Sequence, residues 1–185
     1  MFIQTEPTPN PNVLKFLPGR DVSPRAALEY RTMDEASASP LAEALFGLEG
    51  VDGVFFGADY VSVTRDASGP DWSEMKAPIL GVIMDHFVSG RPLAREGAAD
   101  EGHAADDSEI VAEIKALLDS RIRPAVAHDG GDILFESFDE ATGVLSLRMR
   151  GACSGCPSSS ATLKAGVEQM MRHYVQEVTR VEQTL

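Results

Sequence analysis

Apolar residues in the first 90 positions follow two spacings, one typical of strands and one typical of helices. Segments in which apolar and polar residues alternate, or in which apolar residues form a short run, predict β-strands. These segments are residues 2–5, 13–17, 27–32, 51–56 and 60–64. Residues 39–49 and 72–88 instead repeat apolar side chains with the period of an amphipathic helix. The pattern therefore predicts a small α+β domain over residues 1–90.

The two predicted helices have recognisable starts and apolar faces. Ser39 and Pro40 begin the first helix, and Gly50 is expected to end it. Its predicted buried face comprises Leu41, Ala44, Leu45 and Leu48. The face of the second helix, over residues 72–88, comprises Met75, Ile79, Val82, Ile83, Phe87 and Val88. We expect His86 in this helix to be a surface or boundary residue.

Residues 91–108 break the regular pattern. Their sequence, RPLAREGAADEGHAADDS, is rich in alanine, glycine and acidic residues and has no sustained apolar period. Such a composition buries too little apolar area to offset the entropy lost when the chain is ordered. We therefore predict a flexible acidic linker over residues 91–108, between domains at residues 1–90 and 109–185.

A second set of helices and strands fills residues 109–185. An apolar stripe of helical period opens it and comprises Ile110, Ile114, Leu117, Leu118 and Ile122. Asp107 or Ser108 is expected to cap this helix, and Pro124 is expected to bend or restart it. Strands at 133–138 and 144–149, a helix at 158–174 and a strand at 177–183 follow. The predicted fold class is therefore α+β in two small domains, with the order α-β-β-α-β in the second.

A glycine-rich turn, HDGGD at residues 128–132, joins the first helix of this domain to its first strand. Both glycines are expected to serve the geometry of the turn, and Asp129 and Asp132 are expected to cap nearby N–H groups. A role for these carboxylates beside a metal site is the alternative interpretation.

The only two cysteines of the 185 residues, Cys153 and Cys156, form a C-x-x-C motif between a predicted strand and a predicted helix. Pro157 suits the first turn of that helix, where a missing N–H costs nothing. The positive end of a helix dipole favours thiolate over thiol. Both sulfurs are therefore predicted to be better nucleophiles or metal ligands than isolated cysteines.

Three chemistries fit this motif: disulfide exchange, half of a zinc site and half of an iron–sulfur site. A structural zinc ion or a four-iron cluster usually takes four protein ligands, whereas one chain supplies two thiols. A metal would therefore lie between two chains related by a two-fold axis. A structural cysteine pair or a simple dithiol remains an alternative on spacing alone.

The net charge of −13 argues against a nucleic-acid partner, because the chain has no basic stretch to contact phosphates. No apolar run approaches the roughly 20 residues that span a bilayer. The first residues also lack the basic-then-apolar pattern of a secretory signal. We expect a soluble protein without a membrane partner, located in the cytoplasm of a bacterium or, for a processed eukaryotic form, in the mitochondrial matrix.

Several long stretches resemble NifU-type proteins. Residues 114–167, with AVAHDGGDI at 125–133 and GACSGCPSSSATLKAGVE at 151–168, resemble the NifU C-terminal domain. MFIQTEPTPNPNVLKFLPG at 1–19 and SPLAEALFGLEGVDGVFFGADYVSVT at 39–64 resemble the N-terminal domain of two-domain Nfu-type iron–sulfur carriers. The larger NifU proteins also carry a scaffold domain and a ferredoxin-like domain with their own cysteines, and this sequence has no cysteines left for either.

The resemblance implies an iron–sulfur cluster carrier and scaffold, not an enzyme. It implies a four-iron four-sulfur cluster bridged between two protomers of a homodimer, with Cys153 and Cys156 of each chain at the ligand positions. A two-iron cluster on the same four thiolates is the alternative. The implied partners are an upstream cluster donor and the apo-proteins that receive the cluster.

Two other classes of protein remain as alternatives. A thioredoxin-like oxidoreductase would use Cys153 as the attacking thiol and Cys156 as the resolving thiol, but the βαβ unit expected before such a motif is missing from the predicted order. A zinc-stapled interaction module would form the same dimer as an iron–sulfur carrier. Its colour would distinguish it, because zinc sites are colourless.

Overall fold

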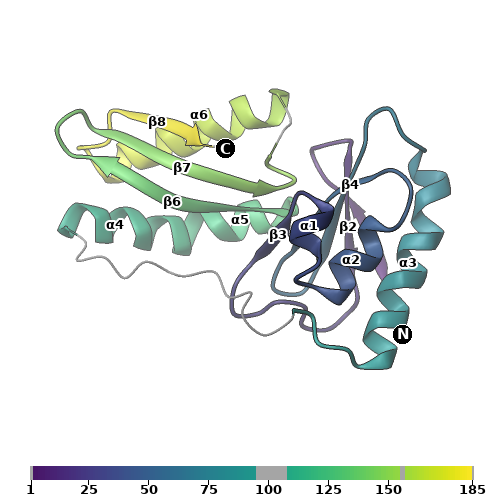
Figure 1. Cartoon of the computed structure of the whole chain (residues 1–185). Helices are drawn as coiled ribbons and strands as arrows, with labels where there is room; N and C mark the ends of the chain where they lie inside the picture. The colour runs from purple at the N-terminus through teal and green to yellow at the C-terminus, as the bar shows by residue number, and fades with distance from the viewer. Residues whose placement is uncertain (1, 95–107, 155–156, 185) are drawn as a thin grey trace. The chain divides into compact units, whose positions relative to one another are not determined.

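The computed structural model of the chain describes residues 2–94, 108–154 and 157–184, with the backbone alone for residues 157–160. The chain divides into two units, residues 1–101 and 102–185. Each unit combines one β-sheet with helices (Figure 1), which confirms the predicted α+β class and two-domain organisation. Most of the predicted linker, residues 95–107, lies outside the described residues. No helix in the described part of the chain is both long and apolar enough to cross a membrane.

The first unit contains a five-stranded antiparallel sheet with the strand order β1-β2-β5-β4-β3. Its strands are β1 (Gln4–Pro7), β2 (Val13–Leu17), β3 (Leu28–Tyr30), β4 (Val51–Phe56) and β5 (Val61–Arg65). All five predicted strands are present. β1 begins two residues later than predicted and includes Pro7. The proline is tolerated because β1 is an edge strand, where a missing N–H breaks no ladder.

Three helices accompany this sheet within residues 2–94: α1 (Met33–Ala36), α2 (Pro40–Phe46) and α3 (Trp72–Ser89). The single turn of α1 was not predicted. The Ser39 side chain accepts a hydrogen bond from the N–H of Ala42 and so caps α2, as predicted. The predicted end of α2 at Gly50 is wrong, because the helix stops at Phe46 with Gly47 as its C-cap. The buried face also contains Ala42, whereas Ala44, which was predicted there, is exposed.

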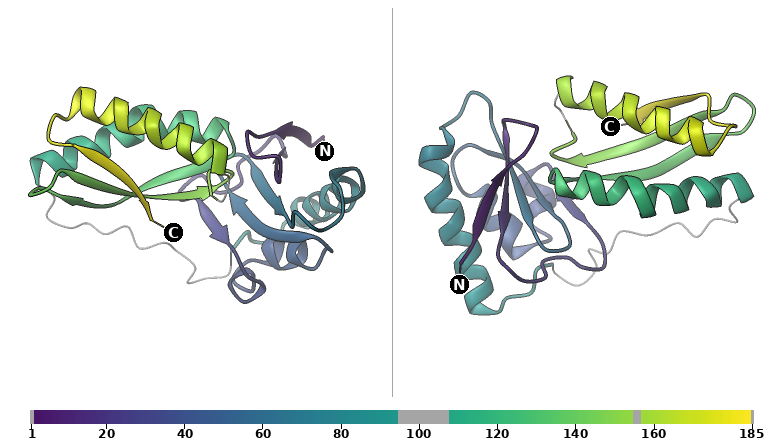
Figure 2. Two further views of the ribbon diagram at one scale, coloured as in Figure 1. Left: turned by 90° about the horizontal axis from the view of Figure 1, so that it is seen from above. Right: turned by 180° about the vertical axis from the view of Figure 1, so that it is seen from behind.

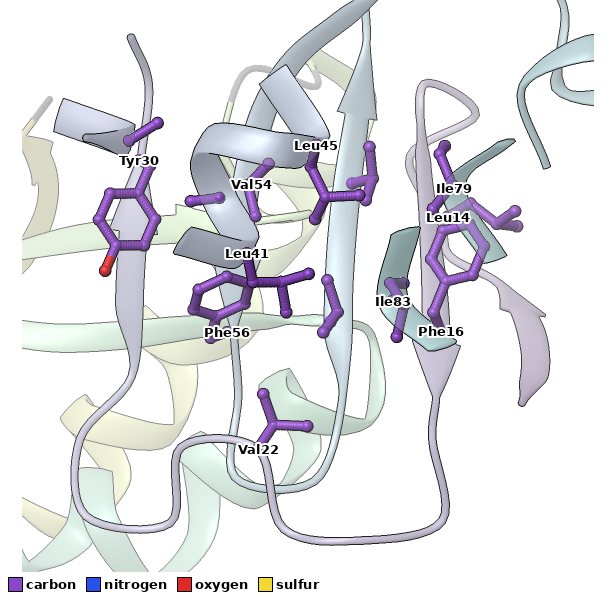
Figure 3. Packing of buried hydrophobic residues seen from close by; sticks show 14 of the residues in the cluster. Leu14, Phe16, Val22, Tyr30, Leu41, Leu45, Val54, Phe56, Ile79 and Ile83 are labelled. Carbon is purple, nitrogen blue, oxygen red and sulfur yellow. The ribbon is translucent and has the colours of Figure 1, made fainter. Parts of the chain in front are cut away.

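α2 and α3 pack on one face of the sheet and form the core of this unit (Figure 3). Leu41, Phe56 and Ile79 are fully buried in this core. Two predictions for α3 are wrong: His86, expected at the surface or boundary, is only 3% exposed, and Val88, expected on the buried face, is 73% exposed. Position 86 lies seven residues after Ile79, so it falls on the buried stripe of α3. Burial lowers the pKa of His86.

The chain stays on the first unit for a few residues after α3. Gly90, with a φ of 65°, terminates the helix in the left-handed conformation. Leu93 then packs partly buried against the core, and its carbonyl accepts a hydrogen bond from the Ser39 hydroxyl. The first residues of the predicted linker therefore belong to the packed surface of this unit.

The second unit follows the predicted order α-β-β-α-β. Its elements are α4 (Glu109–Leu117), the π-helix η1 (Leu118–Ile122), α5 (Arg123–His128), β6 (Gly131–Asp139), β7 (Val144–Gly151), α6 (Pro157–Tyr174) and β8 (Arg180–Thr184). β6 and β7 form an antiparallel hairpin, and α6 returns the chain so that β8 pairs in parallel with β7. β8 begins three residues later than predicted. Ser108 caps α4, which was one of two predicted caps.

Pro124 accounts for the π-helical turn between α4 and α5. Proline has no N–H to donate and its ring crowds the preceding turn, so a regular α-helix cannot pass through it unchanged. The N–H of Arg123 donates to the carbonyl of Leu118, five residues earlier, and α5 restarts with the proline in its first turn. Pro124 therefore restarts the helix as α5, which was one of its two expected effects.

One hydrophobic core joins the helices of the second unit to its sheet. Burial alternates along β7, where Leu145, Leu147 and Met149 are buried. These side chains share a cluster with Ile114 of α4 and with Met171 of α6. Both helical segments therefore lie over the same face of the sheet (Figure 2). The ends of β6 and β7 that carry Gly131 and Gly151 lie side by side, and the cysteine motif begins there.

Candidate functional site

Cys153 lies in a tight turn immediately after β7. Gly151, with a φ of 63°, lets the chain change direction at the end of the strand. The N–H of Ala152 donates to the carbonyl of Gly130 at 3.2 Å, and the N–H of Ser154 donates to the carbonyl of Gly151 at 3.0 Å. The turn is thereby tied to the start of β6.

The backbone of Gly131 forms the surface on which Cys153 packs. A β-carbon at position 131 would lie 2.6 Å from the Sγ atom of Cys153 and 2.7 Å from the carbonyl oxygen of Arg150. Gly130 has a φ of 83°, so it serves the turn, as predicted. Gly131 instead permits the close approach of the thiol. Sequence reasoning missed this role, because only the pairing of Gly131 with Gly151 brings the first glycine near the cysteine.

The Cys153 thiol is part of the hydrophobic core and is only 6% exposed. Burial, followed by the negative charges of Asp129 and Asp132, raises the pKa of Cys153 to about 12. The predicted activation of this thiol by a helix start is therefore wrong for the chain without metal. α6 begins only at Pro157, so Cys153 belongs to the buried strand end and not to the first turn of the helix.

Cys156, the second predicted ligand, lies outside the described residues, and so does the geometry of the complete C-x-x-C motif. Within the part of the chain that the structure describes, no three histidine, cysteine or acidic side chains are placed to hold a metal ion. The donor chemistry that can be assessed is that of the Cys153 thiol. A soft sulfur ligand of this kind suits iron, zinc and iron–sulfur clusters.

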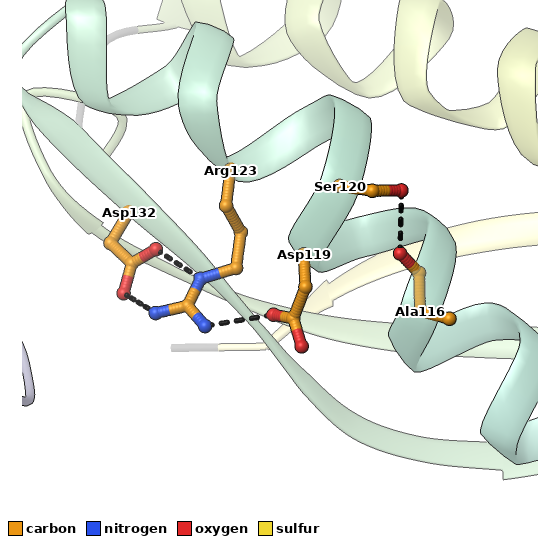
Figure 4. A network of polar contacts seen from close by, with 5 residues as sticks. All are labelled: Ala116, Asp119, Ser120, Arg123 and Asp132. Carbon is orange, nitrogen blue, oxygen red and sulfur yellow. Dashed lines mark hydrogen bonds and ion pairs between the residues drawn. The ribbon is translucent and has the colours of Figure 1, made fainter.

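Asp132 binds an arginine side chain, which corrects the predicted role of this carboxylate as a cap of nearby backbone N–H groups. Its two oxygens accept hydrogen bonds from the side chain of Arg123, at 2.8 Å from Nε and 3.0 Å from Nη2 (Figure 4). Nη1 of Arg123 donates to Asp119 at 2.9 Å. These ion pairs raise the pKa of Arg123. Arg123 was not predicted as a site residue, although its place one residue before the helix-restarting Pro124 was visible in the sequence.

The fold and site together define a class of protein: a two-domain α+β chain whose cysteine motif starts at the end of the central strand of the second sheet. Two family models match within this chain. The model described as Scaffold protein Nfu/NifU N terminal matches residues 3–90, and the model described as NifU-like domain matches residues 114–182. The chain belongs to the Nfu/NifU family.

Relatives of known description match nearly the whole chain. NifU-like protein 5 of Arabidopsis thaliana, a mitochondrial protein, is 50% identical over 187 residues, which cover 99% of this chain and 68% of that protein. A human mitochondrial protein described as an NFU1 iron-sulfur cluster scaffold homolog is 46% identical over 186 residues, which cover 100% of this chain and 72% of that protein. A solved structure of a NifU-like protein from Saccharomyces cerevisiae aligns with a TM-score of 0.47 and 24% identity, over 52% of this chain and 86% of that one.

Proposed function

We propose that this protein takes part in the assembly of iron–sulfur clusters, as a scaffold that carries a cluster and delivers it to apo-proteins. Its membership of the Nfu/NifU family and the description of the human relative as an iron-sulfur cluster scaffold homolog support this role. One structural observation carries the proposal: the turn that holds Cys153 against Gly131 follows directly on β7, so the C-x-x-C motif begins at the end of this strand.

In this proposal, Cys153 and Cys156 of two protomers bind one four-iron four-sulfur cluster. A cluster of this kind takes four thiolates, and one chain contains two cysteines. A two-fold axis near the motif would bring the four sulfurs together. Each thiol gives up a proton when it binds iron and regains one when the thiolates of an acceptor protein replace it.

The raised pKa of Cys153 favours delivery of a cluster over its permanent storage. A thiol whose pKa is about 12 must be deprotonated before it can bind iron, and the free energy of that deprotonation weakens binding. Once an acceptor has taken the cluster, the thiol regains its proton. The same pKa disfavours a thioredoxin-like role, because an attacking cysteine works as a thiolate with a lowered pKa.

We further propose that residues 1–90 and 109–185 act as separate domains joined by a linker over residues 91–108, which is flexible after Leu93, the residue that packs on the first domain. The match to the N-terminal family model ends at residue 90, and the match to the NifU-like model begins at residue 114. These positions support the proposed domain limits. Residues 1–90 contain 13 acidic and 6 basic side chains, so this domain can attract the basic surfaces of recipient proteins. A mitochondrial location would agree with the relatives' descriptions, and a bacterial cytoplasmic location is the alternative.

The experiment that tests the function is anaerobic reconstitution of the full chain with iron and sulfide. Iron, acid-labile sulfide and molecular mass are then measured on the same sample. Four irons and four sulfides per dimer support the proposal, whereas two of each per dimer indicate the two-iron alternative. A colourless protein that retains zinc, or a protein that takes up neither metal and cycles between dithiol and disulfide, would refute it.

A further inference from the structure

A partly buried ion pair between Arg123 and Asp132 lies at the start of β6, next to the turn that contains Cys153. Arg123 of α5 contacts both oxygens of Asp132, through Nε at 2.8 Å and Nη2 at 3.0 Å (Figure 4). The Asp132 side chain is 8% exposed and that of Arg123 is 37% exposed. Two parallel hydrogen bonds from a planar guanidinium fix the orientation of a carboxylate as well as its charge.

Asp132 is one residue away from the surface on which the thiol packs. It follows Gly131, whose backbone contacts the Sγ atom of Cys153, and it pairs in register with Arg150 of β7. The carbonyl of Gly130 on the other side of Gly131 holds the N–H of Ala152. Residues 130–132 thus support the turn at 151–153, and Arg123 connects that support to α5.

The same ion pair also controls the charge beside the thiol. The carboxylates of Asp129 and Asp132 are close enough to Cys153 to act on it electrostatically. A four-iron cluster in its oxidised resting state, held by four thiolates, is a dianion that a buried unpaired carboxylate would repel. The guanidinium of Arg123 partly offsets the charge of Asp132, so this carboxylate can help to fix the strand end and opposes the cluster less than an unpaired carboxylate would.

We propose that Arg123 is a positioning residue of the cluster site, which acts through Asp132 to hold the Cys153 turn in place and to offset the charge of that carboxylate. This inference rests on the proposed function, because it assigns Arg123 a part in cluster binding. Arg123 itself touches neither the thiol nor the cluster in this scheme.

The first test uses the metal-free full chain and hydrogen–deuterium exchange. Arg123→Met should speed exchange in residues 129–132 and 151–153 by at least about tenfold, because it leaves a buried carboxylate without its partner. Arg123→Lys keeps the positive charge but loses the planar guanidinium that forms two parallel hydrogen bonds. Its increase in exchange rate should therefore be smaller than that of Arg123→Met. The matched control is Arg148→Met, which removes an arginine paired with Glu136 at 2.9 Å on the same hairpin. Equal protection of the turn in Arg123→Met and Arg148→Met, or equally faster exchange throughout the second unit, would overturn the inference.

The second test measures the reduction potential of the bound cluster, which a merely structural role would leave unchanged. Removing a nearby positive charge makes a cluster harder to reduce, so Arg123→Met should shift the potential to more negative values. Asp132→Asn should shift it to more positive values, and the double substitution should fall near the potential of the unsubstituted protein. Arg148→Met should give a smaller shift than Arg123→Met. Shifts of equal size in both arginine variants, or no shift in any variant, would contradict the charge role.

The two proposals fail in different ways. If the unsubstituted chain takes up no cluster, the proposed function is wrong, and the exchange measurement still decides whether Arg123 anchors the Cys153 turn. If the unsubstituted chain binds its cluster and Arg123→Met behaves like Arg148→Met in exchange and potential, only the role of Arg123 is wrong.

Discussion

The Sγ atom of Cys153 lies so close to the backbone of Gly131 that a β-carbon on the glycine would approach it to 2.6 Å. That distance is far shorter than any van der Waals contact between sulfur and carbon. The carbonyl oxygen of Arg150 blocks the same space at 2.7 Å. The glycine and the cysteine therefore depend on each other, because any larger residue at position 131 must displace the thiol or separate β6 from β7.

We predict that Gly131→Ala destabilises the metal-free protein by about 1–3 kcal/mol through overpacking and also lowers cluster uptake. The matched control is Gly166→Ala in α6, where a β-carbon meets nothing within 4 Å. The control should stabilise the protein by roughly 0.5–1 kcal/mol, because alanine is a better helix former than glycine. Chemical denaturation and iron content measure the two effects. Equal stabilities of the two variants would contradict the packing described here.

The buried thiol also predicts how the stability of the metal-free protein depends on pH. The pKa of Cys153 rises from 9.0 to about 12 on folding, so below pH 9 the thiol is protonated in both the folded and the unfolded chain. Between these values the unfolded chain loses the proton while the folded chain keeps it. The free energy of unfolding should then fall by up to about 1.4 kcal/mol per pH unit.

Cys153→Ala isolates this contribution from the other groups that titrate at high pH. Urea unfolding of the reduced, metal-free protein is compared with that of the variant at several values between pH 8 and pH 10.5. The difference in unfolding free energy between the two proteins should shrink as the pH rises above 9. A constant difference over that range would show that the thiol is not buried in its protonated form.

The sequence predicted those features that depend on local patterns. The alternation in β7 located Leu145, Leu147 and Met149 on the buried face, and the helix starts at Ser39 and Ser108 followed from ordinary capping chemistry. The prediction for His86 was wrong because it rested on the polarity of histidine. Its spacing from Ile79 and Ile83 places it on the buried stripe of α3.

The electrostatics of the site could not be predicted in the same way. The raised pKa of Cys153 arises from burial and from Asp129 and Asp132, residues that lie more than 20 positions earlier in the chain. Only the pairing of β6 with β7 brings these groups together. The ion pair between Arg123 and Asp132 depends in addition on the π-helical turn, which sets the direction in which Arg123 points. Such relationships belong to the tertiary fold and leave no periodic signal in the sequence.

Single cysteine substitutions test the proposed ligands. Cys153→Ala and Cys156→Ala each remove two of four ligands from a site shared by two chains, so each should abolish stable cluster binding. Cys153→Ala should also destabilise the metal-free protein, because it leaves a cavity in the core of the second unit. Absorbance and iron content after reconstitution report the first effect, and thermal unfolding reports the second. Undiminished cluster content in either variant would refute the role of that cysteine.

The last prediction concerns the independence of the two domains. A fragment of residues 109–185 should fold alone, because its helices and its three-stranded sheet share one hydrophobic core made of residues from this unit. Domains of this size are marginal but often stable. Both cysteines lie within the fragment, so it should also dimerise around a cluster. A soluble, folded fragment that binds no cluster would show that the first domain contributes to the site.

The fragment should differ from the full chain in delivery. If the acidic first domain docks basic surfaces of recipient proteins, its removal should slow transfer to at least some of them. That docking should weaken with added salt, because exposed charges are screened over about 8 Å near physiological ionic strength. Transfer rates to several apo-proteins, measured at low and high salt, test this expectation. A full chain that is faster than the fragment only at low salt supports electrostatic docking, whereas equal rates for every recipient at both salt concentrations eliminate it.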